Sequence, residues 1–154
     1  MNYYYSETIE YLSVIQECFA TDKELIEKWH VLAPCDLESC VRKTYFDLRE
    51  SPSLKLFTLH KRTDDTDEVI GFFGREEIQD IKFLTSFFIK PKFRNKEVLS
   101  FFWDVVGKEI GTDLFSALYS NNSRAQKFLE RNGFNLIQIT ELPEKKEAFI
   151  YHKN

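Results

Sequence analysis

Four basic side chains lie within seven residues, directly before a helical pattern. They are Lys90, Lys92, Arg94 and Lys96, and no acidic residue interrupts them, although the whole chain has a net charge of −4. The first amides of a helix have no partner within the helix, and with the helix dipole they favour an anion. The spacing predicts an anion site at residues 90–96, here called the basic loop. A solvated surface loop is the alternative.

A second polar position opens the next helical pattern. Asn122 follows the short apolar run of residues 114–119, and the pattern after it closes at Asn132 and Gly133, a common end for a helix. An asparagine at a helix start accepts a hydrogen bond from the backbone, and this role is compatible with contact to a ligand. We expect Asn122 to cap its helix.

The periodicity predicts the elements that position these two loops. Strands are predicted at residues 1–5, 54–61, 68–74, 79–90, 114–119, 135–140 and 148–152. Helices are predicted from Ser6 to about residue 19, over residues 22–31, from Asp36 to about residue 48, and over residues 97–111 and 122–132. No repeat or linker divides the pattern, so we expect residues 1–154 to form one domain.

Composition limits the classes of function. The 154 residues include 43% apolar and 16% aromatic side chains, enough for one sizeable core. The negative net charge disfavours binding of nucleic acid through the basic loop, and no apolar run has the roughly 20 residues of a membrane span. We expect a protein of the cytoplasm, or of the inside of a larger particle.

Cysteine and histidine give no sign of metal chemistry. Cys18, Cys35 and Cys40 lack the spacing of a zinc site, and the three histidines (His30, His60, His152) form no ligand set. We expect reduced thiols and no metal.

Two segments resemble the acetyl-CoA motifs of the GNAT superfamily of N-acetyltransferases. One is Phe88-Ile-Lys-Pro-Lys-Phe-Arg-Asn-Lys, and the other runs from Asn122 through Ala125 to Gly133 and Phe134. The order of predicted elements is similar too. The resemblance implies an α+β fold: a single GNAT-like domain whose central mixed, mostly antiparallel sheet of about seven strands is flanked by helices.

The resemblance implies acetyl-CoA as the cofactor and a pyrophosphate site at the first motif. The cofactor-binding residues it implies are Phe88, Ile89, Arg94, Asn95, Lys96, Glu97, Val98, Leu99 and Asn122. In the family the loop reads Arg/Gln-x-x-Gly-x-Gly/Ala, whereas this chain has Glu97 and Leu99 at the glycine positions. Both residues add a side chain where phosphates approach the backbone, and Glu97 adds a like charge. Retention and loss of cofactor binding both stay open.

The resemblance also implies catalytic groups near the fourth and fifth strands of the sheet. The family often places a tyrosine acid in the second motif, where this chain has Leu129. Asp80 and Tyr119 are the candidates for catalysis by position, with Glu76 and Glu77 as further carboxylates; a surface or core-edge role is the alternative for each.

Two functions follow from these patterns. The first is an N-acetyltransferase that moves acetyl from acetyl-CoA to an amine of an unknown acceptor. The second is a catalytically inactive GNAT-like binding or structural protein with a protein partner. Residues 122–129 also resemble phage-encoded GNAT-like proteins, some of which are virion components. The sequence leaves the acceptor and the oligomeric state open.

Overall fold

One mixed sheet organises the computed structural model, which describes residues 2–23, 38, 41, 50–120, 122–142 and 146–153. In this part of the chain the sheet has seven strands in the order β1-β2-β3-β4-β5-β7-β6. The strands are β1 (Tyr3–Thr8), β2 (Lys55–Arg62), β3 (Asp67–Ile78), β4 (Ile81–Ile89), β5 (Leu114–Tyr119), β6 (Asn135–Leu142) and β7 (Lys146–Lys153). Among these seven strands, β4 and β5 form the one parallel pair. The mixed, mostly antiparallel sheet confirms the predicted fold class.

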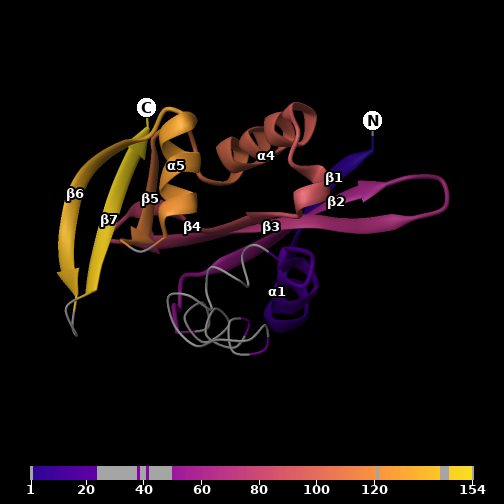
Figure 1. The fold of residues 1–154 in the computed structure, drawn as a ribbon, viewed down its shortest axis with the longest axis horizontal. Helices are drawn as coiled ribbons and strands as arrows, with labels where there is room; N and C mark the ends of the chain where they lie inside the picture. Colours follow the sequence, from indigo (N-terminus) through magenta and orange to yellow (C-terminus); the bar gives the residue numbers. More distant parts are fainter. Residues whose placement is uncertain are drawn as a thin grey trace.

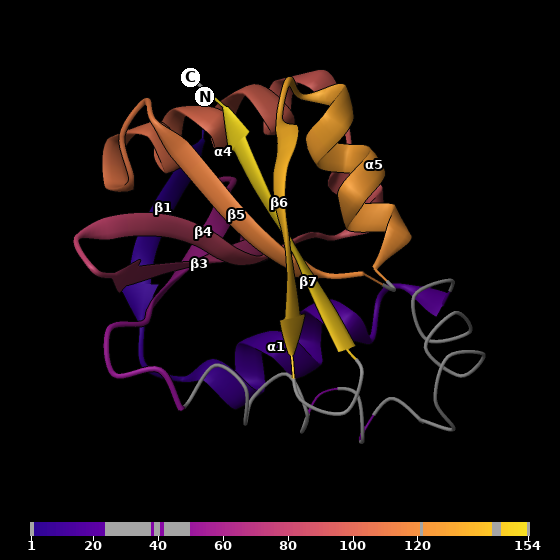
Figure 2. The same ribbon diagram turned by 90° about the vertical axis from the view of Figure 1, so that its left-hand side faces the viewer.

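Helices cover both faces of the sheet. The helices α4 (Lys96–Glu109) and α5 (Ser123–Arg131) lie on one face, and α1 (Tyr11–Phe19) lies on the other (Figures 1 and 2). A short 3-10 turn, η1 (Pro91–Phe93), joins β4 to α4. Phe102 and Leu129 are buried with Leu84 on the α4 and α5 side, while Ile15 is buried with Phe72 and Phe88 under α1.

Aromatic rings fix α5 against α4. The Phe128 ring of α5 lies 5.2 Å from Phe87 of β4 and 5.8 Å from Trp103 of α4, measured between ring centroids. Trp103 also donates its indole N–H to the side-chain oxygen of Asn132, 3.0 Å away, at the end of α5. The two helices that carry the predicted motifs are therefore held in one aromatic cluster with the sheet.

The predicted boundary between the first strand and the first helix is wrong. Ser6 was expected at the helix start, but it belongs to β1, where it pairs with Thr58 of β2, and α1 begins only at Tyr11. The hydroxyl oxygens of Ser6 and Thr58 lie 3.1 Å apart. Pairing with a strand more than fifty residues away has overridden the local capping signal, as tertiary context often does.

The hairpin between β3 and β4 also differs from the prediction. The third strand runs to Ile78 instead of ending near Gly74, so Glu76 and Glu77 belong to β3. Gln79 and Asp80, expected to open β4, form a two-residue turn with φ values of 52° and 67°. Two successive positive φ values match the right-handed twist of a tight hairpin.

Some of the remaining predicted elements are confirmed, and others fall on residues that the structure does not describe. The predicted helices at 97–111 and 122–132 correspond to α4 and α5, and the strands predicted at 114–119, 135–140 and 148–152 correspond to β5, β6 and β7. The predicted helices over 22–31 and from Asp36 lie almost entirely outside the described residues. The single domain of residues 1–154 stays a prediction.

Candidate functional site

The parallel strands β4 and β5 separate in the middle of the sheet. They pair only through Phe83 with Phe115 and Leu84 with Ser116, where the Ser116 hydroxyl donates to the Leu84 carbonyl oxygen at 2.8 Å. Beyond these pairs β4 continues to Ile89 and β5 to Tyr119, each paired with its other neighbour but not with the other strand. The gap therefore opens at the carboxyl ends of both strands, a usual place for a ligand in open sheets.

An irregularity in β4 turns side chains at this gap. Phe73 of β3 pairs with Phe87, but Arg75, two residues on, pairs with Leu84, three residues back along β4. The extra residue at Thr85 and Ser86 is a bulge, which reverses the alternation of the strand. Phe87 consequently joins the same core cluster as Leu84, while Phe88 faces the α1 side.

A close backbone approach holds the end of β4. Gly71 of β3 pairs with Ile89, and a Cβ at this glycine would lie 2.3 Å from the Phe88 carbonyl oxygen. Any side chain at position 71 would push β3 and β4 apart. This glycine therefore helps to set where the basic loop leaves the sheet.

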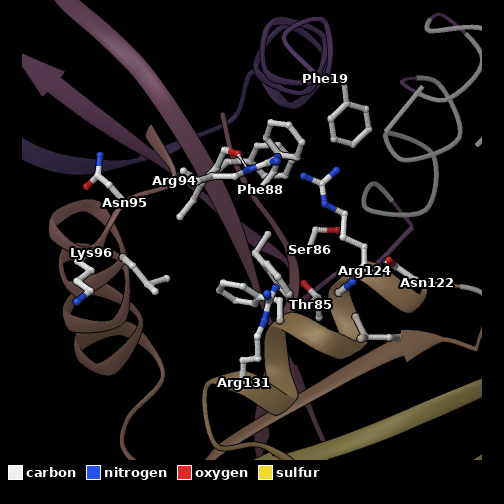
Figure 3. A pocket seen from close by; sticks show the side chains of 17 residues that line it. Phe19, Thr85, Ser86, Phe88, Arg94, Asn95, Lys96, Asn122, Arg124 and Arg131 are labelled. Atoms are coloured by element: carbon white, nitrogen blue, oxygen red, sulfur yellow. Dashed lines mark hydrogen bonds between the residues drawn. The ribbon is translucent and has the colours of Figure 1, made fainter. Parts of the chain in front are cut away.

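A cavity of about 620 Å³ lies over the separated strands (Figure 3). This volume is within the range of small-molecule sites. The residues around it come from α1, β3, β4, β5, the basic loop, α4 and α5. The described lining residues are Phe19, Phe72, Thr85, Ser86, Phe87, Phe88, Ile89, Arg94, Asn95, Lys96, Leu99, Leu118, Asn122, Arg124, Ala125, Phe128 and Arg131.

The charged side chains of this lining are all cations. Arg94 and Lys96 come from the basic loop and the start of α4, and Arg124 and Arg131 come from the two ends of α5. No carboxylate and no histidine belongs to the lining in the part of the chain that the structure describes. In a chain of net charge −4, the cavity is thus a local positive site for an anion.

Asp22 joins the two arginines that flank the cavity. Its Oδ2 accepts hydrogen bonds from Arg94 Nη2 at 2.8 Å and from Arg124 Nη1 at 3.0 Å, and the Asp22 side chain is 3% exposed. Arg94 is further fixed because its Nε donates to the Ile89 carbonyl oxygen at 2.7 Å and its guanidinium carbon lies 5.2 Å from the centre of the Phe88 ring. Lys96 and Arg131 have no ion-pair partner among the described residues.

The start of α4 borders the cavity but is partly occupied by its own side chains. Asn95 Oδ1 accepts a hydrogen bond from the Val98 amide at 3.0 Å, and the Leu99 side chain lines the cavity where the family motif has a small residue. Glu97 does not line the cavity. Burial, and then the neighbouring Glu97 carboxylate, raise the pKa of Tyr3, which places Glu97 beside β1. The negative charge of Glu97, which was expected to repel the phosphates, therefore lies outside the cavity lining.

The start of α5 has the predicted cap. Asn122 Oδ1 accepts from the Ala125 amide at 3.2 Å, and the Asn122 side chain also lines the cavity, as Figure 3 shows. The helix ends at Asn132, after which Gly133 has a φ of 89° and the Phe134 amide bonds to the Leu129 carbonyl. Leu129, at the position of the family's tyrosine, is fully buried.

Most of the predicted cofactor-binding residues meet at the cavity. Those that line it are Phe88, Ile89, Arg94, Asn95, Lys96, Leu99 and Asn122. Glu97 and Val98 do not line it, since Val98 is fully buried in the core. Of the catalytic candidates, Asp80 lies in the exposed hairpin turn outside the lining, and Tyr119 ends β5, with its side chain outside the description.

Sequence reasoning missed Asp22, Arg124, Phe128 and Arg131. The last three share one face of α5, at spacings of four and three residues. This stripe was visible in the sequence as a basic and aromatic face, but nothing local linked it to Asp22, which lies 72 residues before Arg94 and 102 before Arg124.

Metal binding and catalysis by a cysteine nucleophile find no support among the described residues. They contain no group of three or more side chains that could hold a metal ion. Burial raises the pKa of the Cys18 thiol to about 12, so this cysteine is a poor nucleophile. Cys35, Cys40 and His30 lie outside the description. No helix in the described ranges has the length and apolar character that a membrane span requires.

Solved structures of acetyltransferases are similar to this chain along nearly its whole length. PaiA N-acetyltransferase of Thermoplasma acidophilum, in a structure with coenzyme A, is 19% identical with a TM-score of 0.59, and the match covers 100% of this chain and 99% of that chain. An acetyltransferase of Thermus thermophilus is 13% identical with a TM-score of 0.62, covering 97% and 96%. A GNAT-family acetyltransferase of Bacillus cereus is 18% identical with a TM-score of 0.53, covering 99% and 96%.

No protein-family model matches the chain, and no curated protein matches it significantly. At identities below a fifth, the structural similarity establishes the fold. The chain has the GNAT fold, as its two motif-like segments implied.

Proposed function

We propose that this protein is an acetyl-CoA-dependent N-acetyltransferase that acts on an amine of an unidentified acceptor. One observation carries the proposal: the cavity lies where β4 and β5 separate, and it gathers cations from both segments that resemble the acetyl-CoA motifs. Three similar structures of known acetyltransferases support it at the level of fold.

The side chains present fit such a cofactor. Lys96 and Arg131 offer charges without a partner in the described residues, and Arg94 and Arg124 have N–H groups beyond those bound to Asp22. These groups would bind phosphates, while Phe87 and the rest of the aromatic lining would shield an apolar arm from water. Acetyl-CoA, when bound, supplies the activated acetyl group.

Polar neutral groups would orient the acceptor. Thr85, Ser86 and Asn122 line the cavity at the separated strands. The Thr85 hydroxyl oxygen is buried and has no hydrogen-bond partner in the described part of the chain, and a buried hydroxyl normally has one. Tyr119 ends β5 at the same edge and stays our candidate for catalysis, whereas the hairpin position of Asp80 gives it no part in this proposal.

A second function competes with the first. In it the chain is a catalytically inactive GNAT-like binding or structural protein, for example a phage virion component, with a protein partner. Two features favour it. The Leu99 side chain fills cavity space that a phosphate would need, and the Asn95 side chain already accepts the hydrogen bond of the Val98 amide, which a phosphate would otherwise accept. A location in the cytoplasm, or inside a virion, stays a prediction under either function.

Thermal unfolding with and without coenzyme A and acetyl-CoA tests the proposal. A ligand at a hundred times its Kd stabilises the folded state by about 2.7 kcal/mol, which raises Tm by several degrees. We expect such a rise, followed by release of free CoA thiol when amines are screened as acceptors. Absence of any shift at millimolar cofactor would contradict the proposal and favour the inactive scaffold.

A further inference from the structure

Asp22 is a buried carboxylate outside both motif-like segments, at the start of the helix predicted over residues 22–31. It follows α1, in the half of the chain without motif-like segments, yet its Oδ2 binds one arginine from each motif-like segment. The Arg94 and Arg124 side chains are 32% and 34% exposed, whereas Asp22 is 3% exposed. The three residues tie the end of α1 to the basic loop and to the start of α5.

The position of Asp22 affects the charge that the cavity presents. Both arginines line the cavity, but Asp22 is not among the described lining residues. An anion in the cavity would therefore meet guanidinium groups that already carry a carboxylate at 2.8 and 3.0 Å. Charges this close interact strongly in a partly buried site, so the carboxylate opposes the attraction of a second anion.

We propose that Asp22 is a specificity-determining residue of the anion site, acting as an internal counter-ion to Arg94 and Arg124. It lowers the affinity of this wall for small anions, so that a ligand is retained only if it also reaches other groups of the cavity, such as Lys96 and Arg131. The identity of that ligand as coenzyme A rests on the proposed function; the effect of Asp22 on anions does not.

This role has a signature that a purely structural residue lacks. Asp22 also stabilises the fold, because its removal leaves two neighbouring guanidinium groups without their carboxylate. Replacing it should therefore lower Tm while it tightens anion binding. A residue that only holds the arginines in place would lose stability and affinity together.

The test measures binding of inorganic pyrophosphate and of coenzyme A by calorimetry at low salt. We expect Asp22→Asn to bind pyrophosphate at least tenfold more tightly than the wild type, and coenzyme A more tightly as well, with a lower Tm. The matched control is Asp104→Asn, which makes the same charge change at an exposed position of α4. In the background Arg124→Gln, the gain from Asp22→Asn should shrink, because the two residues act through one contact.

The outcomes separate this inference from the proposed function. Unchanged or weaker pyrophosphate binding by Asp22→Asn would overturn the inference, and coenzyme A binding by the wild type would still support the function. A gain for pyrophosphate without any coenzyme A binding would support the inference and contradict the function. If Asp22→Asn does not fold, Asp22→Ser keeps an oxygen acceptor for the arginines and is measured in its place.

Discussion

The N-termini of α4 and α5 border the same cavity and are capped in the same way, but their first turns differ in charge. Each begins with an asparagine whose side chain accepts a backbone hydrogen bond, at 3.0 Å from Val98 and 3.2 Å from Ala125. The first turn of α4 contains Lys96 together with Glu97, whereas that of α5 contains Arg124 and no acidic residue. A carboxylate suits the positive end of a helix dipole, and an arginine opposes it.

This difference shows which helix start departs from the charge preference of an isolated helix. Glu97 satisfies the local preference of α4 and lies beside Tyr3, away from the cavity. Arg124 is locally unfavourable by about 0.3–1 kcal/mol, and it is stabilised by Asp22 from a distant part of the chain. Local rules are broken mainly at functional sites, so the start of α5 is the stronger candidate for ligand contact.

Charge reversal of Lys96 and Arg131, which have no ion-pair partner in the described part of the chain, gives the largest expected effect. Lys96→Glu acts at α4 and Arg131→Glu at α5, and both side chains line the cavity. We expect each change to weaken coenzyme A binding on the order of a hundredfold, because a repulsive charge replaces an attractive one. Calorimetric titration measures both variants.

The control for this pair is Lys92→Glu, which makes the same charge change in η1 at a residue outside the lining. A loss with Lys96→Glu alone would place the phosphates at α4 and reverse the comparison. Equal losses in all three variants would indicate only a general effect of net charge.

Truncation at α4 should have the opposite sign. Leu99→Ala removes a side chain from the cavity, and we expect coenzyme A affinity to rise about tenfold while stability falls by about 2 kcal/mol through lost packing. Titration with coenzyme A and urea unfolding measure the two effects. Glu97→Gln is the matched control, since Glu97 lies outside the lining, and it should leave affinity unchanged.

A gain with Glu97→Gln but none with Leu99→Ala would show that charge, and not space, limits binding at α4. The departures from the family motif would then act through electrostatics after all.

Removal of the two caps gives the smallest effect and the most direct comparison. Asn95→Ala and Asn122→Ala should each lower the free energy of unfolding by about 1 kcal/mol, measured in urea. Their effects on coenzyme A should differ: Asn95→Ala frees the Val98 amide and slightly tightens binding, while Asn122→Ala weakens it. Identical effects of the two variants on binding would mean that both asparagines serve only as caps.

The second half of the chain was predictable because its signals are local. The apolar period of α4, the cap at Asn122 and the stop at Gly133 are each set by residues within a few positions of one another. The boundary between β1 and α1 was not predictable in the same way, because Ser6 is a plausible helix cap until Thr58 pairs with it.

The site was predictable in part for the same reason. Seven of the nine expected cofactor-binding residues line the cavity, since the motif order fixed which loop and helix starts would meet. The sequence could not show that Glu97 and Val98 lie outside the cavity lining, because this depends on which face of the first turn of α4 meets the sheet. The stripe of α5 that carries Phe128 needed its packing partner in β4 to be recognised.

The sequence by itself determined the order of the described strands and of α4 and α5, the cap at Asn122 and the local excess of positive charge in the basic loop, because periodicity, capping and charge spacing act over a few residues. Only the tertiary structure decided the bulge in β4, the gap between β4 and β5, and the carboxylate of Asp22 between two arginines. These features depend on contacts between residues far apart in the chain, whose positions are set by burial of the shared core.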